Sequence, residues 1–298
     1  VQSACVKMII ERDRKRQKYK KTEYFSLKVE LKKENSDSAF EASLNKIGDK
    51  KIVSSNDFDS NTGSLKNKDV IILNEKEAKD LLSKLDSGNW VVKKIDEKPR
   101  TSNPKPPFTT STLQQEAARK LRFSAKNTMR VAQQLYENGF ITYMRTDSTH
   151  LSDEAVKGSR HIVSDLFGDD FLPKSPNNYE TNVKNAQEAH EAIRPAHKIF
   201  KSIDTVSKKL GKDAGNLYDL IWKRTIASQM LPAKLKQTSV IISNADTDFR
   251  ASGQTIVFPG YMKIYVEGKD NPEAELANKE KILPEMSENE ILMCNHIS

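Results

Sequence analysis

Residues 97–107 read EKPRTSNPKPP, and this proline-rich stretch divides the chain into two kinds of pattern. Proline has no backbone N–H, so regular strand pairing is not expected here, and we predict a linker or crossover. Before it, apolar and polar residues alternate as in strands at residues 24–31, 39–47 and 90–95. A helical spacing of apolar residues interrupts them at residues 75–85. The first part is therefore predicted to mix strands with a short helix.

After the prolines the pattern becomes helical. Ser111 and Gln114 have the spacing of a capping box, which predicts a helix that begins there. Apolar residues at helical spacing predict four further helices, at residues 126–138, 153–167, 186–193 and 214–230. Alternation returns after Pro232 and predicts strands at residues 238–243, 255–258, 262–266 and 291–294.

Strand patterns thus lie on both sides of a helical segment. We predict an α+β fold, in which a β domain built from both ends of the chain (residues 22–102 and 233–298) contains an inserted all-helical domain (residues 103–232). Residues 1–21 are predicted to form a separate basic helix at the end of a preceding domain. The chain begins at Val1, without Met or a signal-like segment, so we expect it to be excised from a longer protein.

The charge of the chain favours polyanionic partners. Forty-nine Lys and Arg residues outnumber 41 Asp and Glu residues, which gives a net charge of +8, and cations bind nucleic acid by displacing its counterions. Eight cations lie within residues 1–21, although a solvated helix face explains that segment equally well. No apolar run approaches the ~20 residues that span a bilayer, so no membrane insertion is expected. Cys5 and Cys294 are predicted to be free thiols in a reducing cytoplasm.

Residues 139–148, GFITYMRTDS, carry the most informative chemistry. In an extended segment, residues two apart point the same way, so Tyr143, Arg145 and Asp147 are expected to share one face. A tyrosine has an ordinary pKa near 10 and needs a nearby cation to become a nucleophile, and an arginine fork can hold two phosphate oxygens. The alternative is a half-buried tyrosine beside a surface salt bridge between Arg145 and Asp147.

Residues 186–195, AQEAHEAIRP, form the second informative segment. The predicted helix would end before Pro195 and place His190 and Arg194, four residues apart, on one face. Such a pair suits an anionic ligand, whereas a single histidine is also common as a purely structural residue.

Four blocks, in this order along the chain, resemble the type IA DNA topoisomerases. They are VQS at residues 1–3, PFTTSTLQ at 107–114, ITYMRTDS at 141–148 and QEAHEAIRP at 187–195. Met144 and the HEAIRP sequence are similar to the bacterial topoisomerase I branch, since topoisomerase III proteins usually have proline at the position of Met144.

The resemblance implies an ATP-independent isomerase that relaxes negatively supercoiled DNA. It would cleave one strand transiently, form a 5′-phosphotyrosine intermediate and pass the other strand through the break. Tyr143 would be the nucleophile, Arg145 would hold the scissile phosphate, and His190 would assist through hydrogen bonds.

The resemblance also implies where DNA binds. The expected DNA contacts are Val1, Gln2, Arg145 and Arg194. The partner would be a single-stranded segment of underwound DNA, and the protein would be a monomer in the cytoplasm, at the nucleoid.

The family uses Mg²⁺ bound by an Asp-x-Asp-x-Glu motif in a Toprim domain, and we expect these ligands to lie outside this chain. The Asp-x-Asp pairs at residues 57–59 and 246–248 lack the following Glu and are predicted to lie in polar loops. A calcium loop beginning at Asp57 is rejected because its twelfth position is Lys68. The fragment alone is therefore predicted to be inactive.

Two other classes of function remain open. Tyrosine recombinases and type IB topoisomerases need a dispersed Arg-His-Arg set and a tyrosine near the carboxyl terminus. The central Tyr143, with Arg145 two residues away, argues against them. A non-enzymatic nucleic-acid-binding module fits the basic composition as well.

Overall fold

The computed structural model describes residues 2–34, 38–67, 69–85, 89–179, 190–266 and 282–298. The chain forms two compact units. The first unit comprises Val1–Lys98, Gln237–Gly253 and Ile282–Ser298, and the second comprises Pro99–Lys236 and Gln254–Lys281.

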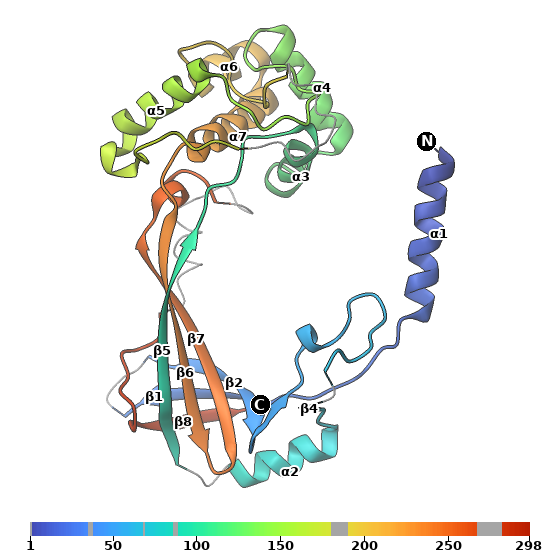
Figure 1. The fold of residues 1–298 in the computed structure, drawn as a ribbon, viewed down its shortest axis with the longest axis vertical. Coiled ribbons are helices and arrows are strands. Elements are labelled where there is room, and N and C mark those ends of the chain that lie inside the picture. Colours follow the sequence, from blue (N-terminus) through green and yellow to red (C-terminus); the bar gives the residue numbers. More distant parts are fainter. Residues whose placement is uncertain (1, 35–37, 68, 86–88, 180–189, 267–281) are drawn as a thin grey trace. The chain divides into compact units, whose positions relative to one another are not determined.

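The first unit is built on a sheet that takes strands from both ends of the chain. In the described residues the sheet has eight strands, in the order β1-β8-β5-β6-β7-β2-β3-β4, and β1 also pairs with β2. The strands are β1 (Lys28–Lys33), β2 (Phe40–Ile47), β3 (Lys50–Ile52), β4 (Val70–Ile71), β5 (Trp90–Ser102), β6 (Ala233–Asn244), β7 (Thr247–Phe258) and β8 (Ile291–Ile297). The β1–β2 pairing closes the run from β1 to β2 into a ring, and Figure 1 shows β5, β6 and β7 side by side. The predicted β domain built from both ends is confirmed.

Alternating burial explains why these segments are strands. In β2 and β7, buried residues recur at every second position, as expected for a sheet with one face on a core. Trp90 packs edge-on against Phe249, with ring centroids 5.0 Å apart. Helix α2 (Glu75–Leu85), predicted over the same residues, adds Ala78 and Leu85 to this core.

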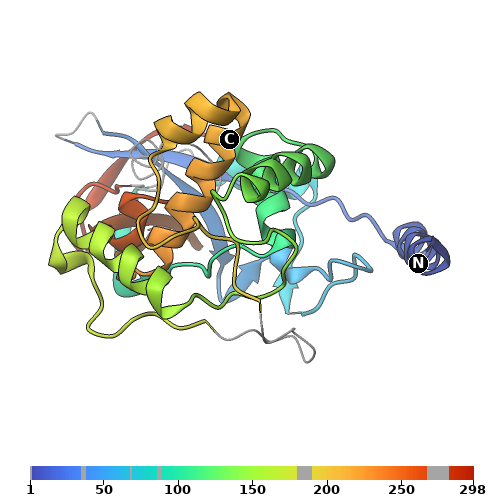
Figure 2. The same ribbon diagram turned by 90° about the horizontal axis from the view of Figure 1, so that it is seen from above.

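The second unit is helical around α7 (Lys212–Ser228), which contacts the four other helices of the unit that the structure describes. They are α3 (Thr110–Lys120), α4 (Ala125–Glu137), α5 (Asp153–Phe167) and α6 (Ile203–Leu210). Figure 2 shows the orange α7 between the yellow-green α5 and the green α4. Residues of α7 are buried on several sides of the helix, as is typical of a helix inside a core. The short α6, which begins at the cap Ser202, was not predicted.

The proline-rich stretch is not wholly a linker, so that prediction is wrong for residues 97–102. Strand β5 continues through Pro99 to Ser102. A strand can include proline where the missing N–H is not needed for pairing. The later prolines, from Pro104 onward, do follow the strand.

Residues 262–266 are not a strand, which corrects another prediction. They overlap a 3₁₀ turn, η3 (Gly260–Lys263), and they belong to the helical unit rather than to the β unit. Tyr261, Met262 and Tyr265 are buried in the core of the helical unit. Their apolar character therefore reflects packing against helices and not the alternation of a strand.

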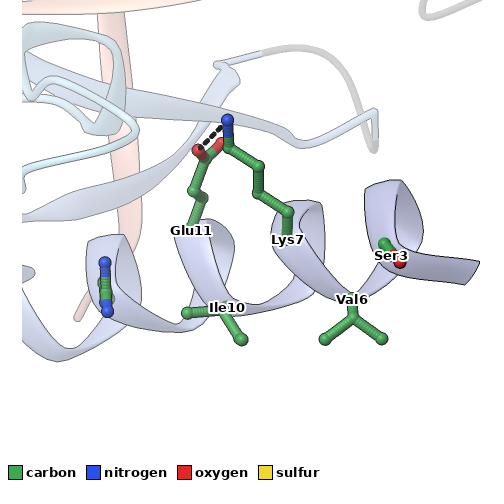
Figure 3. A pocket seen from close by; sticks show the side chains of 6 residues that line it. Ser3, Val6, Lys7, Ile10 and Glu11 are labelled. Atoms are coloured by element: carbon green, nitrogen blue, oxygen red, sulfur yellow. Dashed lines mark ion pairs between the residues drawn. The ribbon is translucent and has the colours of Figure 1, made fainter.

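Helix α1 (Gln2–Lys18) forms within the predicted basic segment 1–21 and ends three residues before its end, and its described side chains are exposed or partly exposed. Figure 3 shows Val6 and Ile10 on one side of the helix, opposite the ion pair between Lys7 and Glu11. The Nζ–Oε1 distance of 3.9 Å and the exposure of both side chains make this pair a weak stabiliser.

Neither cysteine is in a disulfide, and both are exposed. Within the described chain, no helix is both long enough and apolar enough to cross a membrane.

Candidate active site

The stretch around Tyr143 alternates in burial as predicted. Tyr143, with 39% of its surface exposed, shares the accessible side with two charged residues, Arg145 and Asp147. Met144 and Thr146, between them, are buried. The backbone is bent and irregular rather than a regular strand. The sequence prediction of a common face for the phenol and the guanidinium is therefore confirmed.

No salt bridge joins Arg145 and Asp147. In the part of the chain that the structure describes, neither side chain has a hydrogen bond or ion pair. The alternative interpretation of this face as a surface salt bridge is wrong, and the guanidinium of Arg145 has its donors available for a ligand.

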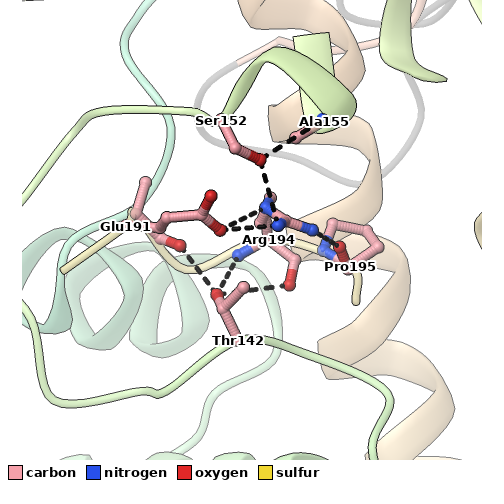
Figure 4. Close-up of polar contacts among 7 residues, drawn as sticks. Thr142, Ser152, Ala155, Glu191, Arg194 and Pro195 are labelled. Carbon is pink, nitrogen blue, oxygen red and sulfur yellow. Dashed lines mark hydrogen bonds and ion pairs between the residues drawn. The ribbon is translucent and has the colours of Figure 1, made fainter. Parts of the chain in front are cut away.

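Thr142 holds one end of the stretch. Its backbone N–H donates to the carbonyl oxygen of Arg194 at 2.9 Å. Its hydroxyl donates to the carbonyl oxygen of Ala192 at 2.7 Å and accepts the backbone N–H of Arg194 at 3.0 Å, as Figure 4 shows. An isolated bridge between Ile141 and Pro195 continues this contact. Two segments that are distant in sequence therefore lie against each other beside Tyr143.

Thr110 holds the other end from the first turn of α3. Its hydroxyl lies 2.9 Å from the carbonyl oxygen of Met144 and accepts the backbone N–H of Thr146 at 2.9 Å. Its own N–H donates to the carbonyl oxygen of Thr146. These bonds fix the backbone on both sides of Arg145, whose side chain is exposed.

The cap of α3 differs from the prediction by two residues. Thr109 is the N-cap, and Thr112 completes the capping box by accepting the N–H of Thr109 at 2.9 Å. Ser111 instead lies inside the helix. Because the cap is Thr109, the side chain of Thr110 is free to bind the segment that carries Arg145.

Replacing Thr110 by Val is expected to lower the free energy of unfolding of the helical unit by about 1–3 kcal/mol, because the N–H of Thr146 loses its partner. Thr110→Ser should restore most of it. The exposed Ser111→Ala, on the next residue, should change it by less than about 0.5 kcal/mol. The measurement is a urea titration with fluorine NMR of 5-fluorotryptophan, in which Trp222 reports unfolding of this unit and Trp90 reports unfolding of the other. Equal stability of the Val and Ser variants would contradict the role of the hydroxyl.

Two rings flank Tyr143. Tyr136, on α4, lies edge-on to it with ring centroids 5.3 Å apart. His190 lies with its ring centroid 6.0 Å away and tilted by 34°. The structure thus brings together the three predicted residues Tyr143, Arg145 and His190 in one local region, with Tyr136 as an additional neighbour.

His190 and Arg194 do not share a helix face, which corrects the prediction for this segment. Residues 190–195 are extended, and the part of the predicted helix at 186–189 lies outside the described residues. The segment is held extended by bridges from Ile193 to Phe108 and from Pro195 to Ile141. Pairing with these segments overrides the local helical pattern.

Arg194 is buried, with 8% of its surface exposed. Its guanidinium binds Glu191 at 2.6 Å, the carbonyl oxygen of Pro195 at 2.8 Å and the hydroxyl of Ser152 at 3.3 Å (Figure 4). This arrangement joins the 190–195 segment to the start of α5. The guanidinium of Arg194 thus holds that segment in position. The expected contact between Arg194 and DNA stays a prediction.

The other expected DNA contacts cannot be placed by their side chains. Val1 lies outside the described residues, and Gln2 is the first residue of α1, but its side chain is not described.

The Asp-x-Asp pairs are engaged in local contacts. Hydrogen bonds from Ser54 and Lys51 lower the pKa of Asp57 to about 2, and Asp59 accepts the N–H groups of Asn61 and Thr62. Asp248 lies in β7, not in a loop as predicted, and pairs with Lys93. Among the described residues, no group of three or more His, Cys, Asp or Glu side chains could hold a metal ion.

Sequence reasoning missed Thr110, Thr142 and Tyr136 as parts of the site. Both threonines lie inside the segments that the resemblance singled out, which was an available signal. Their partners are backbone groups far away in sequence, and no local pattern reveals such partners. Tyr136 falls on the apolar face of a predicted helix, where a core role is the ordinary expectation.

Comparison with known proteins defines the class. A family model described as DNA topoisomerase matches residues 1–298, so the chain belongs to the DNA topoisomerase family. The relatives identify the bacterial topoisomerase I branch. DNA topoisomerase 1 of Synechocystis sp. is 48% identical over all of this chain and 33% of its own length. DNA topoisomerase 1 of Streptomyces coelicolor is 44% identical over all of this chain and 32% of its own length.

A solved structure agrees. Full-length topoisomerase I from Thermotoga maritima superposes with a TM-score of 0.69 at 28% identity, covering 100% of this chain and 44% of that one. The chain spans about one third of the length of the curated relatives it matches.

Proposed function

We propose that this chain is the strand-cleaving part of a type IA DNA topoisomerase that relaxes negatively supercoiled DNA without ATP. The observation that carries the proposal is the accessible face with Tyr143 and Arg145, beside His190. The basic composition supports DNA as the partner. In the same proposal, the protein acts as a monomer on a single-stranded segment, in the cytoplasm at the nucleoid.

The chemistry is an exchange of one phosphodiester for another. The Tyr143 hydroxyl oxygen attacks the scissile phosphorus and loses its proton, the bond from phosphorus to the 3′ oxygen breaks, and that oxygen gains a proton. Arg145 holds two phosphate oxygens and stabilises the developing charge. His190 assists with a hydrogen bond to phosphate. Because no high-energy bond is lost, the freed 3′ hydroxyl can reverse the step.

In this proposal, the residues that bind Mg²⁺ lie outside this chain. The described residues do not offer a cluster of metal ligands, and the carboxylates at 57–59 are taken by Lys51, Ser54 and backbone N–H groups. We therefore place the Mg²⁺ ligands of the whole protein in another domain and assign no step of this chain to the metal.

The test is a chimera in which this chain replaces the matching third of the Synechocystis relative. The chimera should relax a negatively supercoiled plasmid. With a 3′-labelled oligonucleotide, the covalent adduct should carry the label, because the tyrosine keeps the 5′ phosphate of the downstream piece. The chain alone should bind single-stranded DNA and leave the plasmid supercoiled.

Two results would count against the proposal. The first is a folded chimera that binds DNA but neither relaxes it nor forms an adduct. The second is an adduct labelled from the 5′ end of the oligonucleotide, since this is the polarity of the type IB enzymes and recombinases.

A further inference from the structure

A polar groove of about 420 Å³ lies in the first unit, on strands distant from Tyr143 in sequence. Its polar lining comes from four neighbouring strands, β2, β5, β6 and β7. The polar residues are Asn45, Asp96, Lys98, Gln237, Ser239 and Arg250.

The charge around this groove is positive. Lys94 pairs with Asp96 at 2.9 Å. A hydrogen bond from Lys94, and then the charges of Lys94, Lys98 and Arg250, hold the pKa of Asp96 below its usual range. Three cations therefore surround one carboxylate, which leaves two positive charges uncompensated within this group.

The donors in the groove are available for a ligand. Ser239 accepts the Nε–H of Arg250 at 2.8 Å, which fixes the guanidinium and leaves its two terminal NH₂ groups without a partner in the described residues. Within the same residues, the side chains of Lys98, Asn45 and Gln237 also have no hydrogen-bond or ion-pair partner. Charged and amide donors that lie close together and have no bonded partner among the described residues suit an anion with several oxygens.

We propose that this groove binds the phosphodiester backbone of nucleic acid. The inference rests on the proposed function and adds to it a DNA contact that is separate in sequence from the Tyr143 site. Lys98 and Arg250 come from β5 and β7, which are separated by β6. Two strand spacings amount to roughly 10 Å, so the two cations can bind different phosphates. Single strands and duplexes share this chemistry.

The test is fluorescence anisotropy with the full chain and a labelled oligonucleotide, single-stranded and as a duplex, over a series of salt concentrations. In the double variant Lys98→Gln/Arg250→Gln, the slope of log affinity against log salt should become shallower. The change should be about 1.4 for a single strand or about 1.8 for a duplex, as two lost phosphate contacts require. The form of DNA that shows the change is the form that the groove binds.

A control variant separates the groove from overall charge. Lys76→Gln/Lys84→Gln on α2 removes two positive charges from the same unit and should leave the slope nearly unchanged. Asp96→Asn should act in the opposite direction and tighten binding, because a carboxylate that repels phosphate is removed.

If the groove variant and the α2 variant have equal slopes while the unchanged chain binds DNA, the groove is not a phosphate-binding site, and the proposed function still stands. A chain that binds no DNA at any salt concentration would overturn both. Loss of the tyrosine adduct in the chimera, with the slope change intact, would overturn the proposed function alone.

Discussion

Tyr143→Phe is expected to abolish the covalent protein–DNA adduct and plasmid relaxation in the chimera. The phenylalanine keeps the ring and its packing against Tyr136 and His190, but it has no oxygen to attack phosphorus. The rates of adduct formation and of relaxation should fall to the background of the assay, because the proposal assigns no second nucleophile to this face. Anisotropy should show DNA binding within about twofold of the unchanged protein, since phosphate contacts dominate affinity.

Tyr136→Phe is the matched control. It removes a hydroxyl from the neighbouring exposed tyrosine, whose ring lies 5.3 Å from that of Tyr143. Adduct formation should persist in this variant. A persistent adduct in Tyr143→Phe, or its loss only in Tyr136→Phe, would show that Tyr143 is not the nucleophile.

The second large effect is expected for Arg224→Met, in the core of the helical unit. Arg224 is 4% exposed and lies over the rings of Phe108 and Tyr265. It donates to the carbonyl oxygen of Pro106 at 2.7 Å and to the Tyr265 hydroxyl at 3.1 Å. That hydroxyl donates in turn to the buried carboxylate of Glu116 at 2.9 Å. Burial raises the pKa of Tyr265, so it remains a protonated donor.

Methionine fills much of the same space but makes none of these hydrogen bonds. The helical unit should lose about 3 kcal/mol or more of unfolding free energy, since each hydrogen bond from a charged group contributes roughly 1.5–3 kcal/mol. The midpoint of the unfolding transition that the Trp222 fluorine signal follows should move to a lower urea concentration. The Trp90 signal follows unfolding of the other unit.

Arg119→Met is the control for charge near Glu116. Arg119 also binds that carboxylate, at 2.7 Å, but its side chain is 58% exposed. Its removal should therefore lower stability by less than about 1 kcal/mol. Equal losses for Arg224→Met and Arg119→Met would contradict the assignment of the buried network as the main anchor of this core.

Much of the secondary structure followed from local pattern. Residues 75–85 and 153–167 were predicted as helices and are α2 and α5 with the same bounds, because their amphipathic spacing agrees with their packing. The predictions failed where tertiary contacts decided. Residues 262–266 overlap a 3₁₀ turn and pack on helices, and β5 runs through Pro99.

The sequence by itself determined the fold class, the family and the common face of Tyr143 and Arg145, because alternation and ordered motifs are properties of neighbouring residues. Only the tertiary structure decided what holds that face in place. Thr110 and Thr142 bind backbone groups that are tens of residues away. Arg194 is buried and pairs with Glu191. Such contacts depend on which segments meet in space, and no local spacing encodes that.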